Sequence, residues 1–513
     1  MTIQTVFGLE RGFLSTNDEL NNDGHDILCN TSLEGDGRVV ERMKLYINGE
    51  WREAKSYTEL KSPYSRETIA EIPAATEQEV DEAIAAAYAK RQTMAAMPAY
   101  ERAAILERVV EQLKERQEEA AKLIALEAAK PITTAKGEVA RTIQTYKFAA
   151  EEAKRVHGET LPLDAAPGGE NRIAMTVREP IGVIGAITPF NFPMNLVAHK
   201  LGPAIASGNT VVLKPASQTP LSAYFIAELF EKAGLPKGAL NVVTGSGRTV
   251  GDAIVTDPRI SMITFTGSPE VGIAIRNKAG LKRVTLELGS NSAVIVDEQV
   301  DLNRVIPRCV FGAFTFQGQV CISLQRIYVH ENRYDEFVEK FVAEAKRLKT
   351  GDPLDPATDV SALITPGDVD RALSWIEEAK QGGANVVLGG ERDGNILLPT
   401  VIVDAKPTMK VSCQEVFAPI VLINRIRSID EAIALVNDSR YGLQAGIYTD
   451  NVHTAWKAAK QLHVGGVLIN DIPTFRVDHM PYGGVKESGF GREGIRYAIE
   501  EMTELKLIIF NEN

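Results

Sequence analysis

Cysteine is scarce in this chain, whose 513 residues include four, at positions 29, 309, 321 and 413. The four show no C-x-x-C spacing and no nearby histidine pair, so the sequence supports no zinc site and predicts no metal. So few cysteines in so long a chain favour a reducing compartment, and we expect the cytoplasm. The open question is which of the four thiols, if any, is reactive.

Long apolar runs and an excess of basic charge are also missing. No stretch is long and apolar enough to predict a membrane span, and residues 1–25 lack the basic start and apolar run of a secretory signal. The formal net charge of −12 argues against the clustered basic surface that binds nucleic acid. A hydrophobic content of 44% is ordinary for a soluble globular protein, and the length implies two or more domains.

The chain divides into an unpatterned start and a long patterned body. Residues 1–42 are rich in Asn, Asp, Glu and Gly without sustained periodicity, so we expect a poorly ordered extension there. The folded body begins near residue 43, and apolar periodicity predicts helices over 98–128 and 133–156.

From residue 172 onward, short and continuously apolar strands alternate with helices. This alternation predicts right-handed βαβ units in a buried parallel sheet, with ligands at the carboxyl ends of the strands. A second series follows Glu287, so we predict two α/β lobes with a cleft between them. The predicted strands are 181–188, 210–214, 240–243, 261–265, 293–296, 326–329 and 386–388, and the predicted helices are 194–206, 221–233, 249–255, 269–277, 302–315 and 334–348.

Three strand-to-helix turns carry residues suited to phosphate or ribose. Two of them, residues 245–251 and 265–272, are rich in glycine, and in the third, residues 213–217, a strand ends on Lys214. Glycine lets the backbone approach a phosphate, and a helix N-terminus attracts its negative charge. One such turn alone is most often a connection that needs positive φ. Three on successive βα units favour a dinucleotide.

Cys321 and Glu287 are the candidates for a nucleophile and a general base. A free cysteine is usually a small buried hydrophobe, but Gly318 and Gln319 put Cys321 in an irregular loop, where a reactive thiol is expected. Glu287 lies inside an apolar run, and poor solvation would raise its pKa and suit it to accepting a proton from water. A buried glutamate held by a salt bridge stays open as the alternative.

Seven short motifs occur in order along the chain, and together they resemble the motif series of the aldehyde dehydrogenase superfamily. Each motif is short, but seven in the correct order are highly specific, and the resemblance covers roughly residues 43–510. The motifs are Thr188–Pro193 (TPFNFP), Lys214–Ala216 (KPA), Phe265–Ser268 (FTGS), Glu287–Gly289 (ELG), Gly318–Cys321 (GQVC), Glu415–Pro419 (EVFAP) and Pro481–Gly489 (PYGGVKESG).

The resemblance implies an NAD(P)-dependent, non-acylating aldehyde dehydrogenase, closest in style to bacterial lactaldehyde and succinate-semialdehyde enzymes. The implied fold is α/β, with two doubly wound parallel-sheet lobes, one a Rossmann-like cofactor domain and one a catalytic domain, plus a β-hairpin oligomerisation element that makes a homodimer or homotetramer. The expected bounds are 43–157 and 179–287 for the cofactor domain, 288–480 for the catalytic domain, and 158–178 and 490–513 for the oligomerisation element.

The same resemblance implies the catalytic roles. Cys321 is the nucleophile that attacks the aldehyde carbon, and Asn191 together with the backbone N–H of Cys321 stabilises the oxyanion. Hydride then passes to the nicotinamide, and Glu287 activates the water that hydrolyses the thioester. Lys200 matches a family lysine thought to tune this machinery, although a structural role fits it equally.

For the cofactor, the resemblance puts Lys214 and Glu415 at the two riboses and Phe417 near the nicotinamide ribose. NAD-selective relatives usually carry glutamate at position 217, whereas Ser217 leaves room for the 2′-phosphate of NADP beside Lys214. We therefore expect NADP to be accepted alongside NAD. The implied cofactor-binding residues are Thr188, Pro189, Phe190, Lys214, Ser217, Gly247, Gly251, Phe265, Gly267, Ser268, Val271, Leu288, Glu415 and Phe417.

The expected substrate is a small, hydroxylated or anionic aldehyde. Phe192, Asn195 and His199 are predicted to bind it, because the helix face that carries Asn195 and His199 lines the aldehyde tunnel in similar enzymes. Arg476 in a later loop would add positive charge, unless it is exposed to solvent. Val320 is apolar where relatives specific for phosphorylated aldehydes carry arginine, which counts against glyceraldehyde 3-phosphate.

Two other functions compete with this hypothesis. A CoA-acylating relative would pass the thioester to a thiol, but such enzymes generally lack the base carboxylate, so Glu287 favours hydrolysis. A nucleotide-binding structural protein could keep the fold without turnover, but the intact set of Cys321, Glu287 and Asn191 argues against it.

Overall fold

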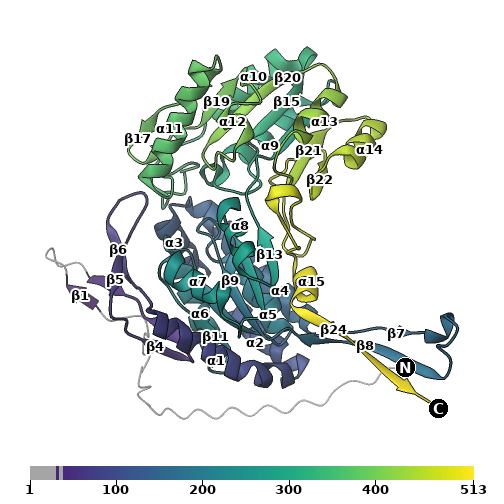
Figure 1. Ribbon diagram of the computed structural model, residues 1–513. Coiled ribbons are helices and arrows are strands. Elements are labelled where there is room, and N and C mark those ends of the chain that lie inside the picture. Colours follow the sequence, from purple (N-terminus) through teal and green to yellow (C-terminus); the bar gives the residue numbers. More distant parts are fainter. Residues whose placement is uncertain (1–30, 34–38, 513) are drawn as a thin grey trace, which may run out of the picture.

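The computed structural model describes residues 31–33 and 39–512, which form two α/β lobes and a projecting β-sheet arm (Figure 1). Most of the expected extension 1–42 lies outside the described residues. Within it, Thr31–Leu33 (β1) and Val39–Arg42 (β2) are strands of a small sheet, beside the hairpin of Tyr57–Lys61 (β5) and Thr68–Pro73 (β6).

An eight-stranded sheet forms the centre of the first lobe, in the order β23-β13-β12-β9-β10-β11-β3-β4. The five strands from β13 to β11 are parallel, which confirms the predicted fold class, and β23, β3 and β4 pair antiparallel at the two edges. The strands are Arg283–Glu287 (β13), Met262–Thr266 (β12), Val183–Ile187 (β9), Thr210–Lys214 (β10), Leu240–Val242 (β11), Leu45–Ile47 (β3), Glu50–Arg52 (β4) and Gly489–Phe490 (β23).

Helices cover both faces of this sheet, as two separate hydrophobic clusters show. One cluster holds side chains of α2 to α6 and α15, and the other holds side chains of α1, α7 and α8. The helices are Glu77–Ala96 (α1), Ala99–Glu115 (α2), Gln117–Ala128 (α3), Ile132–Ala153 (α4), Asn195–Ala206 (α5), Leu221–Lys232 (α6), Asp252–Thr256 (α7), Pro269–Lys278 (α8) and Ile495–Glu501 (α15).

The predicted helix over 98–128 is two helices, α2 and α3. The chain turns at Arg116, whose φ of −106° and ψ of 21° end the first helix. The Arg116 side chain bonds both Glu119, at 2.7 Å, and Glu228 of α6, at 3.0 Å. No glycine or proline marks the turn, and the apolar periodicity continues across it, so the pattern alone predicted one helix.

The second lobe is built on a seven-stranded sheet, in the order β16-β19-β20-β15-β14-β21-β22. Six strands are parallel, but β16 pairs antiparallel with β19, so the predicted strand 386–388 is an edge strand rather than another parallel unit. The strands are Ala293–Val296 (β14), Arg326–His330 (β15), Asn385–Leu388 (β16), Thr400–Val403 (β19), Ile420–Ile426 (β20), Gln444–Tyr448 (β21) and Gly466–Ile469 (β22), and the helices are Leu302–Phe314 (α9), Glu331–Ala345 (α10), Pro366–Gln381 (α11), Lys410–Cys413 (α12), Ile429–Asn437 (α13) and Val452–Gln461 (α14).

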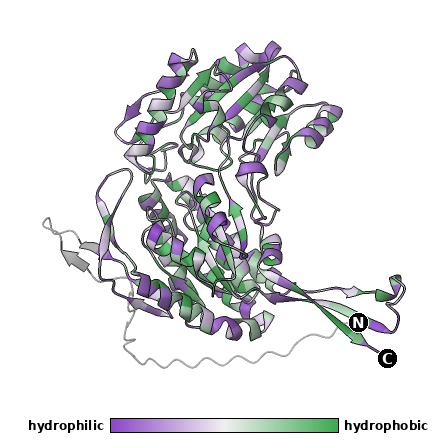
Figure 2. Cartoon of the chain, in the orientation of Figure 1, coloured by the Kyte–Doolittle hydropathy of each residue, from purple (hydrophilic) through white to green (hydrophobic). Residues whose placement is uncertain are grey.

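The arm is a three-stranded antiparallel sheet of Thr160–Leu161 (β7), Arg172–Pro180 (β8) and Thr503–Asn511 (β24). It projects from the first lobe (Figure 1). Hydropathy follows the layers of both lobes: apolar residues lie along the central strands and polar residues on the outer helices (Figure 2). Among the described residues, no helix is both long and apolar enough to cross a membrane.

Candidate active site

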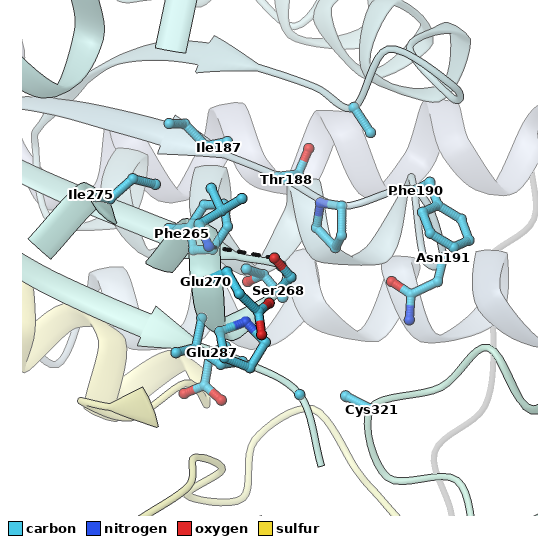
Figure 3. A pocket seen from close by; sticks show the side chains of 18 of the residues that line it. Ile187, Thr188, Phe190, Asn191, Phe265, Ser268, Glu270, Ile275, Glu287 and Cys321 are labelled. Atoms are coloured by element: carbon cyan, nitrogen blue, oxygen red, sulfur yellow. Dashed lines mark hydrogen bonds between the residues drawn. The ribbon is translucent and has the colours of Figure 1, made fainter. Parts of the chain in front are cut away.

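A cavity of about 1020 Å³ lies at the carboxyl ends of the first lobe's parallel strands and extends to loops of the second lobe. Strand β9 leads into it at Thr188, β10 at Lys214, β12 at Gly267 and β13 at Glu287. This is the edge at which the alternating pattern predicted a ligand site. Figure 3 shows Asn191, Glu287 and Cys321 among the lining side chains.

Two helix N-termini border the cavity and are capped by serines. The Ser246 side chain accepts a hydrogen bond from Thr249 N at the start of a π-helical turn, Gly247–Gly251, and Ser268 accepts from Val271 N at the start of α8. Both turns supply backbone N–H groups that suit a pyrophosphate. At this point the sequence predicted an α-helix over 249–255, and the structure has the π-turn followed by α7.

Two glycines beside α8 have no room for a side chain. A Cβ on Gly267 would lie 2.5 Å from Cζ of the Phe265 ring, and a Cβ on Gly272 would lie 2.5 Å from Cδ2 of Leu288. The two glycines therefore let the turn and the start of α8 pack closely on Phe265 and Leu288, which line the cavity.

All but one of the predicted cofactor-binding residues line the cavity. The exception is Ser217, which is exposed, while its neighbours Ala216 and Gln218 do line it. The residues in the lining are Thr188, Pro189, Phe190, Lys214, Gly247, Gly251, Phe265, Gly267, Ser268, Val271, Leu288, Glu415 and Phe417.

Glu415 and Lys214 are ionisable groups suited to ribose hydroxyls. The Glu415 carboxylate accepts a hydrogen bond from Ser290 N at 2.8 Å, and burial raises its pKa to about 7. Burial also lowers the pKa of Lys214. Gly289 lies against the Glu415 carboxylate, where a Cβ would overlap it. With the capped helix N-termini and a cavity of about 1020 Å³, these residues fit a nicotinamide dinucleotide.

Cys321 lines the cavity, is partly exposed and follows a strained loop. Phe316 and Gln317 both have left-handed backbone conformations, with φ of 46° and 55°. Gln317 holds the loop in place, because its side-chain amide donates to Ala129 O at 2.8 Å and to Ala362 O at 2.9 Å. The irregular loop was predicted; its two left-handed residues were not.

The Cys321 thiol is a weak acid in this setting. Burial raises its pKa to about 11, although a hydrogen bond with Tyr482 acts in the opposite direction. The Sγ–Oη distance of that bond is 2.9 Å. The other cysteine for which a pKa shift is resolved, Cys309, is fully buried in the core of the second lobe.

Asn191 lies beside the thiol loop and is 3% exposed. Its side-chain amide donates to Gln319 O at 2.9 Å. A primary amide has two N–H groups, so this bond fixes the amide and leaves the second N–H for a ligand. The Lys130 ammonium donates to Asn191 O at 2.7 Å and lies between the rings of Phe192 and Phe316.

Glu287 ends β13 and is 4% exposed. Among the described residues neither of its carboxylate oxygens has a hydrogen-bond partner, so the alternative of a glutamate held by a salt bridge is not what the structure contains. Burial raises the pKa of Glu287 well above its usual value, and the nearby charge of Glu493 raises it further. These are the surroundings expected of a base that accepts a proton from water.

Lys200 does not line the cavity but is part of a buried polar network close enough to Glu287 for its charge to act on that carboxylate. Its ammonium donates to Thr264 at 3.1 Å and Thr266 at 2.8 Å, and it lies 3.4 Å from Glu493. Burial opposes the ionisation of Glu493, but Lys200 and Arg476 outweigh it and lower the pKa of Glu493 to about 2. Lys200 therefore neutralises the negative charge of the Glu493 carboxylate.

The prediction for Asn195 and His199 differs from what the structure contains. Both are buried, neither lines the cavity, and both bond the same carboxylate oxygen of Asp478, at 3.0 Å and 2.9 Å. Burial, followed by the charge of Arg476, lowers the pKa of His199, so the imidazole is neutral at pH 7. The two side chains do lie on the same helix face, as predicted, but that face packs on the buried carboxylate of Asp478 and not on the cavity.

Arg476 and Phe192 are the other two residues predicted to bind substrate. Arg476 lines the cavity rather than facing solvent, bonds Glu493 at 2.8 Å, and packs its guanidinium 3.7 Å from the centroid of the Tyr482 ring. Phe192 does not line the cavity but packs in the same hydrophobic cluster as Cys321.

Four residues of this region were missed from the sequence: Arg141, Asp478, Tyr482 and Glu493. Arg141 and Asp478 form a pair at 2.6 Å between positions 337 residues apart. Tyr482 stands inside the last quoted motif, so its place near the site was readable, but its contact with the thiol was not. Among the described residues, no group of three or more His, Cys, Asp or Glu side chains could hold a metal ion.

The comparisons with known proteins agree with this geometry. Residues 51–508 match the aldehyde dehydrogenase family model. A 3-sulfolactaldehyde dehydrogenase of Priestia megaterium is 49% identical over 92% of this chain and 98% of its own length. The chain therefore belongs to the aldehyde dehydrogenase family, and it is an oxidoreductase that oxidises an aldehyde with NAD or NADP.

Two solved structures share the fold over nearly the whole chain. Aldehyde dehydrogenase 21 from Physcomitrella patens, in complex with the reaction product succinate, has a TM-score of 0.90 and 41% identity, covering 92% of this chain and 98% of that one. The glyceraldehyde-3-phosphate dehydrogenase GapN from Methanocaldococcus jannaschii, complexed with NADP, has a TM-score of 0.86 and 42% identity, covering 89% and 100%.

Proposed function

We propose that this enzyme oxidises a short anionic or hydroxylated aldehyde to its acid through a thioester on Cys321. The observation that carries the mechanism is that Cys321, Asn191 and Glu287 line the same cavity, whose other lining residues suit a dinucleotide. When bound, NAD or NADP supplies the acceptor for the hydride that leaves the substrate carbon.

In this mechanism the Cys321 thiolate attacks the aldehyde carbon, and the carbonyl electron pair moves onto oxygen. The second N–H of the Asn191 amide and the backbone N–H of Cys321 then stabilise the negative charge. Because Gln319 already holds the amide, the donor is preorganised and costs little to orient. After oxidation the acyl group stays on sulfur as a thioester.

Glu287 is the proposed base of the second half-reaction. Its carboxylate accepts a proton from water, the hydroxide oxygen attacks the thioester carbon, and the C–S bond breaks to release the acid and the thiolate. Lys200 and Glu493 are proposed to set the charge behind Glu287. A CoA-acylating enzyme would not need this base, and the unpaired, buried Glu287 supports hydrolysis over acyl transfer.

The proposed preference for an anion depends on Arg476. It lines the cavity near Cys321, and its buried Nε has no hydrogen-bond partner among the described residues. Three cations (Arg141, Lys200 and Arg476) contact two carboxylates (Asp478 and Glu493), so one positive charge is in excess while the nearby Glu287 is protonated. The related enzymes that act on 3-sulfolactaldehyde or release succinate support the same class of substrate.

Substitution of Arg476 by leucine is expected to change substrate preference. For succinic semialdehyde or 3-sulfolactaldehyde, kcat/KM should fall on the order of 100-fold, because a charged hydrogen bond is lost. For neutral propionaldehyde the loss should be about tenfold or less, since only the support of Glu493 and Tyr482 is affected. Steady-state assays of Arg476→Leu, with Arg476→Lys as the charge-retaining control, measure this ratio; equal losses for both substrates would refute the role.

We further propose that NADP is used alongside NAD. The Ser217→Glu variant should lower kcat/KM for NADP about tenfold or more while NAD is affected little, because a carboxylate there would repel the 2′-phosphate. Assays with saturating aldehyde and each cofactor in turn test this. Unchanged use of NADP would mean that the 2′-phosphate lies away from position 217.

Val320 predicts that glyceraldehyde 3-phosphate is a poor substrate, and the same steady-state assay with this aldehyde tests that prediction.

We also propose that the arm joins subunits into a homodimer or homotetramer, with the domain bounds given from the sequence. Its strands carry exposed apolar side chains, and Leu505, Leu507 and Ile509 alternate along one face of β24. Light scattering should give two or four times 55.9 kDa. Leu507→Lys should shift the mass toward the monomer, whereas Val452→Lys, at an exposed apolar position on α14, should not. A monomeric parent protein would contradict the proposal.

A cytoplasmic location is proposed as well. Three cysteines are described, and all three are free thiols. The mechanism requires a reduced sulfur at position 321, which a reducing compartment maintains.

A further inference from the structure

We propose that Tyr482 is a further catalytic residue, whose hydroxyl donates a hydrogen bond to Cys321 Sγ and stabilises the thiolate that attacks the aldehyde. The two atoms are 2.9 Å apart, and Tyr482 is 3% exposed. Among the described residues, Sγ is the only hydrogen-bond partner of this hydroxyl. The inference rests on the proposed function, because it requires Cys321 to be the nucleophile.

The phenol is held in place by contacts that do not involve its oxygen. Tyr482 N donates to Glu493 O at 3.0 Å, and Glu493 N donates to Tyr482 O at 2.7 Å. The guanidinium of Arg476 lies 3.7 Å from the ring centroid on one face, and Arg476 is itself fixed by the Glu493 carboxylate. Removal of the hydroxyl alone should therefore leave the ring and the backbone where they are.

The direction of the hydrogen bond follows from which group ionises first. Burial raises the pKa of Tyr482 well above its usual value, whereas the pKa of Cys321 is about 11. The phenol therefore keeps its proton while the thiol loses its own to solvent water. In the ionised state the Tyr482 O–H is the donor and the sulfur the acceptor, and no bond of the phenol is broken.

The hydrogen bond matters because the rest of the site opposes ionisation of the thiol. Burial disfavours the thiolate, and the carboxylates of Glu415 and Glu287 add to that effect. Among the described residues, the Tyr482 hydroxyl and the charge of Arg476 are the influences that favour the thiolate. A neutral donor in contact with the sulfur therefore raises the fraction of thiolate in a site that otherwise disfavours it.

The experiment is alkylation of Cys321 by iodoacetamide between pH 7 and 11, in the full-length enzyme without aldehyde or cofactor. Digestion and mass spectrometry of the peptide that contains Cys321 keep the other thiols out of the signal. In Tyr482→Phe the apparent pKa of alkylation should rise by about one unit, with alkylation about tenfold slower at pH 8. At pH 11 the wild-type rate should have reached about half of its plateau, so its curve bends there, while that of the variant should still rise about tenfold per pH unit.

A matched control is Tyr146→Phe, which also removes one fully buried hydroxyl but from the core between α4 and α6, where Tyr146 packs on Phe230. It should leave the alkylation curve unchanged. A Tyr482→Phe curve that superimposes on the wild-type curve would overturn the proposal, as would a slower curve that bends at the same pH as the wild-type curve. Failure of the proposed function would appear separately, as aldehyde turnover by a Cys321→Ala variant, which the alkylation assay does not measure.

Discussion

The Cys321→Ala variant is expected to lose aldehyde oxidation, with kcat lower by on the order of a thousandfold or more, while it still binds NADP. Without the sulfur no covalent bond forms to the aldehyde carbon, and the hydride has no tetrahedral intermediate from which to leave. Cofactor binding should survive because Lys214, Glu415 and the capped helix N-termini lie on other elements. Absorbance of the reduced cofactor measures turnover, and fluorescence titration measures binding.

Cys413→Ala is the control for this prediction. Cys413 is also partly exposed, but it ends the short helix α12 and does not line the cavity. Its replacement should leave kcat unchanged. Normal turnover by Cys321→Ala would refute the covalent mechanism, and parallel losses in both variants would indicate a general effect of removing thiols.

The Glu287→Gln variant is expected to complete one half-reaction and then stop. Mixed rapidly with aldehyde and NADP, it should release about one equivalent of reduced cofactor per active site, followed by a steady-state rate lower by on the order of 100-fold or more. The burst remains because attack and oxidation need Cys321 and Asn191, whereas hydrolysis needs a base. Stopped-flow absorbance resolves the two phases.

The pH dependence supplies a second test of the same residue. Because burial raises the pKa of Glu287, its carboxylate form accumulates only as the pH rises, so hydrolysis of the thioester by the parent enzyme should accelerate with pH through that value. In Glu287→Gln this rise should be absent.

In the rapid-mixing experiment, a Glu287→Gln protein that shows the steady-state loss but no burst would indicate that Glu287 acts before the thioester forms.

Much of the fold was readable because the strands are buried on both faces. Strands such as Val183–Ile187 and Thr210–Lys214 are buried throughout, with apolar centres, and are separated by helices with clear periodicity, so their type and their place in the chain followed from local pattern. The antiparallel pairing of β16 was not readable, because strand direction depends on the partner β19 and not on the residues of β16. The turn at Arg116 depends likewise on contacts with α6.

The parts of the site that could be predicted are those whose residues are neighbours in the sequence. The glycine turns and the loop before Cys321 are defined by neighbouring residues, whereas the partners of Asn195 and His199 are not. Their spacing predicted one helix face, but Asp478, which that face contacts, lies 279 residues beyond His199. The hydrogen bond between Tyr482 and the thiol spans 161 residues and has no sequence signal beyond the motif in which Tyr482 lies.

The most direct test of the central claim is the mass of the enzyme after a single turnover. Glu287→Gln protein, mixed with aldehyde and NADP and quenched in acid, should be heavier by the mass of the aldehyde less two hydrogen atoms, with the added acyl group on the peptide that contains Cys321. The same treatment of the double variant, which carries both Glu287→Gln and Cys321→Ala, should give no adduct. An acyl group on another residue, or a burst of reduced cofactor with no adduct at all, would contradict a thioester on Cys321.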